Sequence, residues 1–125
     1  MKKIVATKSA PAAVGPYSQA VWAGDTLYLS GQIAIDPSIG KLVSGRIEEQ
    51  TTQIFHNIAE VLQAANLTLD NIVKTTVFVT DIANFAKVNA IYAEFFTANP
   101  PARSTVGVKE LPLGALVEIE SIAVK

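Results

Sequence analysis

Two stretches with the apolar spacing of helices, separated by one stretch with the composition of a strand, place the tightest limits on the fold. Between residues 47 and 65, apolar side chains recur at steps of three and four, and charged or amide side chains take most of the other positions. Residues 72–80 (IVKTTVFVT) are mostly β-branched or aromatic, which is typical of a strand. Thr80 or Asp81 is expected to cap a second helix that runs to about Phe96. The two prolines at positions 100 and 101 prevent it from continuing.

Shorter apolar stretches on either side complete an order of strands, helix, strand, helix and strands. The further strands are expected over residues 3–6, 17–23, 26–33, 103–109 and 116–124. In the central strand, Val73, Val77 and Val79 are expected to share one face. This order predicts a single α+β domain over residues 1–125, with a mixed sheet and both helices packed on one face of it.

The sheet face away from the helices is also expected to carry apolar side chains. Hydrophobic residues make up 50% of the chain and charged residues only 17%, which gives more apolar surface than one small core consumes. Covering that face by association is the simplest solution, so we expect a homo-oligomer.

Charge and composition disfavour several kinds of partner. The net charge is −1, and no cluster of Lys or Arg offers the footprint that nucleic acid or an anionic membrane requires. With no cysteine and one histidine, disulfides, thiol nucleophiles and thiolate metal sites are excluded, and no metal is expected. The apolar stretch near the start is too short for a secretory segment, and no run approaches the roughly 18 residues of a membrane span. We therefore expect a cytoplasmic protein.

Charged residues in otherwise apolar strands are the first candidates for chemistry. Arg103 begins a strand, where it either forms an ion pair at the strand end or offers a guanidinium fork that binds a carboxylate through two parallel hydrogen bonds. Glu118 and Glu120 are two residues apart, so both lie on one strand face together with Leu116 and Ile122. Two acids on such a face indicate either a functional or interfacial pocket or an edge strand with solvated acids.

Several uncharged residues and the single histidine allow two interpretations each. Gly31 follows an apolar strand, where it permits close approach of a ligand or another chain, or simply makes a turn. Tyr17 and Ser30 complete this candidate set. Asn89 is an ordinary polar position on a helix by its spacing. His56 falls on the polar side of the first helix and is expected to be a solvated surface residue.

These candidates lie within short blocks that follow one another over essentially the whole chain. The blocks are APAAVGPYSQ (residues 10–19), LSGQI (29–33), VKTTVFV (73–79), VNAxY (88–92), PARSxV (101–106), LP (111–112) and VEIE (117–120). In this combination the chain resembles the Rid/YjgF family of reactive-intermediate deaminases, and within it the RidA branch. The block around Arg103 is the most informative, because it separates active deaminase branches from members that lack the arginine.

The resemblance implies a chorismate-mutase-like α+β fold, assembled as a homotrimer with clefts between subunits. It also implies hydrolysis of 2-iminopropanoate and 2-iminobutanoate to 2-keto acids and ammonia, with no cofactor and no metal. In that scheme Arg103 binds the substrate carboxylate and Glu118 positions or activates the attacking water. The residues that line the cleft, partly from the neighbouring subunit, are then Tyr17, Ser30, Gly31, Asn89, Ala102 and Ser104.

Two other functions stay open on the sequence. A non-catalytic trimeric protein that binds small carboxylates for regulation uses the same gripping residues, so the sequence does not separate it from an enzyme. A ribonuclease activity has been attached to relatives of this family, but the chain has no basic patch and no pair of histidines for acid–base work.

Overall fold

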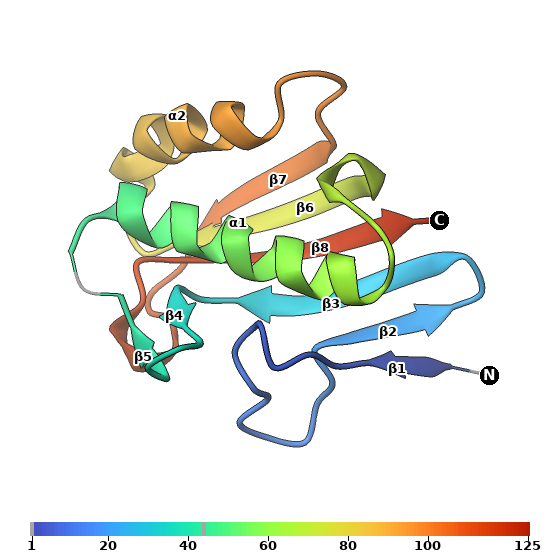
Figure 1. The fold of residues 1–125 in the computed structure, drawn as a ribbon. Helices are drawn as coiled ribbons and strands as arrows, with labels where there is room; N and C mark the ends of the chain where they lie inside the picture. The colour runs from blue at the N-terminus through green and yellow to red at the C-terminus, as the bar shows by residue number, and fades with distance from the viewer. Residues whose placement is uncertain (1, 44) are drawn as a thin grey trace.

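Six strands form one mixed sheet, and both α-helices of the described chain lie on the same face of it (Figure 1). The computed structural model describes residues 2–43 and 45–125. The strands of the sheet are β1 (Lys3–Val5), β2 (Ala20–Ala23), β3 (Thr26–Gln32), β6 (Ile72–Val79), β7 (Ala102–Gly107) and β8 (Val117–Val124). Across the sheet their order is β1-β2-β3-β8-β6-β7. The predicted α+β class, with a mixed sheet and helices on one face, is confirmed.

The helices begin where the sequence supplies suitable first turns. In α1 (Ile47–Ala64) two acidic residues occupy the first turn, where they suit the helix dipole. Ahead of α2 (Phe85–Phe95), the Asp81 carboxylate accepts a hydrogen bond from the Ala83 amide at 3.0 Å and starts a short 3-10 turn that leads into the helix. In the described part of the chain, neither helix combines the length and hydropathy that crossing a bilayer requires.

The strand order brings distant parts of the sequence together. Strands β6 and β7 are parallel, joined through α2, and every other pair in the sheet is antiparallel. Strand β8 therefore lies between β3 and β6, which places the end of the sequence beside residues near its beginning. Strand β3 has a bulge against β8, because Leu29 pairs with Ser121 while Gln32 pairs with Ile119.

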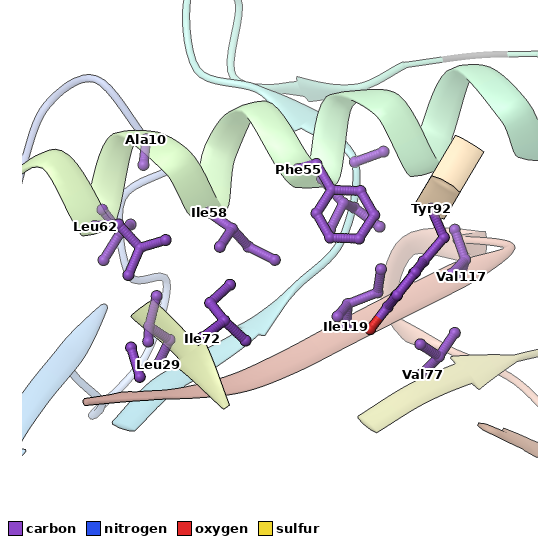
Figure 2. Close-up of a cluster of buried hydrophobic side chains, with 14 of the residues drawn as sticks. Ala10, Leu29, Phe55, Ile58, Leu62, Ile72, Val77, Tyr92, Val117 and Ile119 are labelled. Atoms are coloured by element: carbon purple, nitrogen blue, oxygen red, sulfur yellow. The ribbon is translucent and has the colours of Figure 1, made fainter. Parts of the chain in front are cut away.

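The core fills the space between α1 and the sheet (Figure 2). Phe55 is fully buried, and its ring lies edge-on to Tyr92 with centroids 5.5 Å apart and stacks on Phe95 at 4.9 Å. Figure 2 shows Ile58 and Leu62 of α1 pointing at the sheet beneath them. Burying a side chain of this size contributes about 1.5–3 kcal/mol to stability. The aromatic contacts tie α2 to α1 and so fix the position of α2 over β6 and β7.

Four local features of the structure differ from what the sequence led us to expect. Val73 is 48% exposed rather than inward, because the pairing with β8 shifts between Ile72 and Lys74, and Thr75 joins Val77 and Val79 on the buried face. Strand β2 begins at residue 20, so residues 17–19 belong to a loop. Strand β7 covers residues 102–107 rather than 103–109. A small hairpin of β4 (Ile35–Asp36) and β5 (Lys41–Leu42) was not expected from the sequence. Two-residue strands carry too little alternation to be seen in a sequence.

Candidate functional site

Glu118 lies on β8, on the sheet face away from the helices. Its neighbours Val117 and Ile119 are fully buried toward the helices, so alternation along the strand turns Glu118 the other way. The carboxylate of Glu118 covers the backbone of Gly31, because any Cβ on that glycine would collide with Glu118 Oε2. The sequence suggested that a ligand or another chain approaches Gly31 closely, whereas in the described chain the group that lies against it is the Glu118 carboxylate. Because Gly31 has no side chain, the Glu118 carboxylate can occupy the space next to its backbone.

The surroundings of Glu118 favour its protonated form. Partial burial raises the pKa of the Glu118 carboxyl above its ordinary value, and the nearby charge of Glu120 raises it further. A carboxylate whose pKa is raised is a better proton acceptor than that of an ordinary surface glutamate. Glu118 is thus suited to accept a proton from water and to return it.

The bulge in β3 places Ser30 and Gly31 next to Glu118. Ser30 is fixed twice: its hydroxyl donates to the Ser18 carbonyl at 2.6 Å, and its amide donates to the Gln19 carbonyl at 3.0 Å. The proton of the Ser30 hydroxyl is therefore engaged, and a ligand meets an oxygen that can only accept.

Gln19, which the sequence did not single out, holds the loop before β2. The buried Gln19 carboxamide accepts from the Thr7 amide at 2.6 Å and donates to the Thr7 carbonyl at 3.0 Å and the Pro11 carbonyl at 2.8 Å. Tyr17 lies in the same loop, is 50% exposed, and its hydroxyl accepts from the Val14 amide at 3.4 Å. The role of a buried glutamine depends on its hydrogen-bond partners, which the sequence does not show. The sequence therefore gave no signal for Gln19.

These groups share one cavity of about 650 Å³, here called the Glu118 cavity. It is lined by Pro11, Ala12, Val14, Tyr17, Gln19, Ser30, Gly31, Gln32, Ile33, Ile35, Gly40, Pro112, Leu113 and Glu118. The lining is mostly apolar with a few polar groups, which is typical of small-molecule sites.

Arg103 lies elsewhere, on β7, with its side chain on the helix face of the sheet. Its Nη1 donates to Asn89 Oδ1 on α2 at 2.7 Å. The guanidinium carbon lies 4.8 Å from the ring centroid of Tyr92 and 5.3 Å from that of Phe85, so the group is held over two aromatic faces. Asn89, an ordinary helix position by its spacing, is a direct partner of Arg103. We call Arg103, Asn89, Phe85 and Tyr92 the Arg103 group.

Arg103 has no carboxylate partner within residues 2–43 and 45–125, where the ion pair found joins Arg46 to Glu49. The strand-end ion pair considered from the sequence is thus not formed in the described chain. A positioned guanidinium with unused donors is suited to bind an external carboxylate.

The neighbours of Arg103 on β7 divide between the two faces. Ala102 and Ser104 are exposed on the face away from α2, where Ser104 Oγ accepts from Lys74 Nζ at 3.4 Å. Thr105 shares the Arg103 face, and its buried hydroxyl has no hydrogen-bond partner in the described chain. Thr105 was not among the residues predicted for the site, although its spacing of two from Arg103 places both side chains on one strand face.

Within one chain the two groups do not converge. Arg103 pairs with Thr75 and Glu118 with Phe78, so the Cα atoms are two strands apart and three residues apart along the sheet, which is roughly 14 Å. The side chains also point to opposite faces. A substrate of a few carbons cannot contact both residues of the same copy.

The remaining candidates stay outside both groups. His56 is exposed on α1, and its ring meets the edge of Phe95 at 5.8 Å between centroids. Glu120 is exposed on the same face of β8 as Glu118. Across the described ranges, no three His, Cys, Asp or Glu side chains come together as a set that could hold a metal ion.

Known proteins are similar to this chain over nearly its whole length. The family model described as Endoribonuclease L-PSP matches residues 7–125. A human protein named 2-iminobutanoate/2-iminopropanoate deaminase is 46% identical over 125 residues, which is 100% of this chain and 91% of the human protein. A solved structure of a Rid family protein from Yersinia pestis has a TM-score of 0.98 at 54% identity and covers 100% of both chains. A solved structure from Thermotoga maritima, named for an endoribonuclease, has a TM-score of 0.97 at 48% identity and covers 100% of this chain and 98% of that one. The matched region contains the Arg103 group and the Glu118 cavity in full.

Proposed function

Because the chain belongs to the YjgF/Rid family, we propose that it hydrolyses reactive 2-imino acids to 2-keto acids and ammonia. The substrates proposed are 2-iminopropanoate and 2-iminobutanoate, which give the human, mouse and rat relatives their names. The observation that carries the proposal is the Arg103 guanidinium, which Asn89 and two aromatic rings hold in place without a carboxylate partner in the described chain.

The complete site is proposed to lie between two copies of the chain. The Arg103 group of one copy faces the Glu118 cavity of the next, so that one small substrate meets both. Two observations support this arrangement. The two groups point to opposite faces of one sheet, and the sheet face without helices exposes large apolar side chains such as Tyr28 and Val106. A closed ring of three copies uses every such half-site once, in agreement with a homotrimer.

The reaction then divides between the two groups. Arg103 binds the carboxylate and fixes the position of the neighbouring C2. Glu118 accepts a proton from water as the water oxygen adds to C2, and the electron pair of the C=N bond goes to nitrogen. Glu118 returns that proton to the nitrogen, which gives a carbinolamine with a hydroxyl and an amino group on C2. Glu118 then carries the hydroxyl proton to the amino nitrogen, the C–N bond breaks, and ammonia leaves as the C2–O group becomes the keto group. Arg103 binds and orients the carboxylate and takes no part as a base.

The test is a trapping assay with matched arginine variants. A dehydratase acting on serine generates 2-aminoacrylate, and semicarbazide traps the imine that the protein has not hydrolysed. We expect the unmodified protein to suppress semicarbazone formation and Arg103→Ala to abolish that suppression. Arg103→Lys keeps the charge but loses the planar fork, and we expect kcat/KM to fall about 10- to 100-fold.

The control is Arg46→Lys, an exposed arginine paired with Glu49, which we expect to behave like the unmodified protein. Full activity of Arg103→Ala would contradict the proposal. If neither the unmodified protein nor any variant suppresses semicarbazone formation, while a small carboxylate still raises the melting temperature, the proposed enzyme function is replaced by the alternative of a protein that binds carboxylates.

A further inference from the structure

Leu113 adopts a backbone conformation that a leucine rarely takes. Its φ of 58° and ψ of 20° lie in the left-handed region, which favours glycine and asparagine over a residue with a large apolar side chain. The other non-glycine residues with positive φ in the described chain are Asn66 and Asn99, which tolerate the conformation. Leu113 is thus the exception among them.

Nothing inside the described chain repays this strain by burial. The Leu113 side chain is 73% exposed, and the next residue, Gly114, also has a positive φ. Pro112 and Leu113 nevertheless line the Glu118 cavity. Strained residues that persist on the surface are concentrated where they serve a binding site. The backbone here presents a large apolar side chain to a cavity, at a cost that the fold itself does not require.

The chemistry of the cavity indicates what that side chain meets. Its polar groups include Glu118, Ser30 and Tyr17, and the rest of the lining is largely apolar. A three-carbon imino acid fills only a small part of about 650 Å³. With C2 beside Glu118 and the carboxylate directed to the Arg103 of another copy, the third substituent on C2, the substrate's own side chain, extends along the apolar lining.

We propose that Leu113 is a specificity-determining residue, whose side chain forms the apolar wall against which the substrate's side chain packs. The inference rests on the proposed function, because it concerns the same site. It assigns a role to a residue that touches neither the carboxylate nor the reacting carbon. Leu113 affects larger, branched substrates most, since they reach furthest along the wall.

The test compares two substrates in two variants. An amino-acid oxidase, with catalase present, generates the imino acids of alanine and of leucine, and the semicarbazide assay gives kcat/KM for each. Leu113→Asn has a similar size, suits the left-handed conformation and makes the wall polar. We expect the ratio of kcat/KM for the leucine-derived to the alanine-derived imine to fall about tenfold. Leu113→Met keeps the wall apolar, and we expect it to hold the ratio within about twofold of the unmodified protein. Ile39→Ala is the control, because Ile39 is also exposed and apolar but does not line the cavity.

The outcomes separate this inference from the proposed function. A ratio unchanged in Leu113→Asn, with both imines still hydrolysed by the unmodified protein, overturns the role of Leu113 and leaves the function standing. A loss of assembly in Leu113→Asn, seen by sedimentation, with both substrates reduced equally, also overturns it and makes Leu113 an interface residue. No turnover of either imine by the unmodified protein overturns the proposed function and this inference with it.

Discussion

The position of Glu118 depends on an atom that Gly31 lacks. A Cβ at Gly31 would meet the carboxylate of Glu118, which is the mobile end of a flexible side chain. An added methyl group therefore displaces the carboxylate more easily than it disturbs the backbone. At this scale the requirement for glycine is steric, since no positive φ is involved at Gly31.

Replacing Gly31 by alanine should separate activity from stability. We expect Gly31→Ala to lower kcat/KM for imine hydrolysis by about a hundredfold, because positioned acid–base assistance is lost. The free energy of unfolding should change by no more than about 1 kcal/mol, since Glu118 can rotate away. The matched control is Gly107→Ala, where a Cβ meets only ordinary contacts and both quantities should stay unchanged. Kinetics with denaturant titration measure the two effects, and an active Gly31→Ala protein would refute the assigned place of Glu118.

The charged candidate residues could be predicted from the sequence, but the residues that hold or surround them could not. Arg103 and Glu118 stand out because each interrupts an apolar strand. Gln19 did not stand out, because its importance lies in burial and in partners that the fold supplies. Thr105 did not stand out, because the burial of its unpartnered hydroxyl is visible only in the structure. Leu113 was missed for a related reason, since an exposed leucine in a loop carries no signal until its backbone angles are known.

At the level of elements, the alternation of β8 couples its two acids. Glu118 and Glu120 share a face, and the charge of Glu120 contributes to the raised pKa of Glu118. Removing that charge lowers the pKa of Glu118. In the proposed mechanism Glu118 must be ionised to accept a proton, so we expect activity to fall as the pH drops through its pKa. The acid limb of the pH profile of kcat/KM should therefore move to lower pH in Glu120→Gln.

The control for this shift is Glu94→Gln, an exposed acid on α2. Its pH profile should overlay that of the unmodified protein. A Glu120→Gln profile with the acid limb in place, or moved to higher pH, would rule out Glu118 as the group that titrates.

Long elements were predicted well and short ones poorly. Helix α1 and strand β6 contain many residues whose spacing indicates the type of element, and their boundaries lie within a residue or so of the expected ones. Strands β4 and β5 have two residues each and show no period. The outward turn of Val73 depends on a shift in its pairing with β8, which is a property of two strands and is absent from the sequence of one.

At the scale of the whole molecule, the proposed site exists only where two copies meet. The sequence indicated association from its apolar surplus, and the exposed rings and branched side chains on the open sheet face agree with it. It did not indicate that Arg103 and Glu118 are on opposite faces, because that follows from the registers of β6 with β7 and β8. The resemblance to the family, in contrast, already implied clefts between subunits.

A mixing experiment tests the shared site directly. Arg103→Ala and Glu118→Gln copies should each be inactive alone. Unfolded together in equal amounts and refolded, they should recover about one quarter of the unmodified activity, because in the proposed trimer each mixed assembly contains one cleft with both residues intact. If both residues served a site within one copy, the mixture would stay inactive. Refolding the two variants separately before mixing supplies the control.

The central position of β8 in the sheet also determines how late the complete sheet can form during synthesis. Of the six strands in the sheet, β8 is the last that a ribosome releases, yet it joins β3 to β6. Until residues 117–124 emerge, strands β1–β3 and strands β6–β7 lack the strand that joins them into one sheet, and each part has exposed edges. Such edges are open to pairing with other chains. The nascent chain therefore depends on its final strand for protection from aggregation as well as for Glu118.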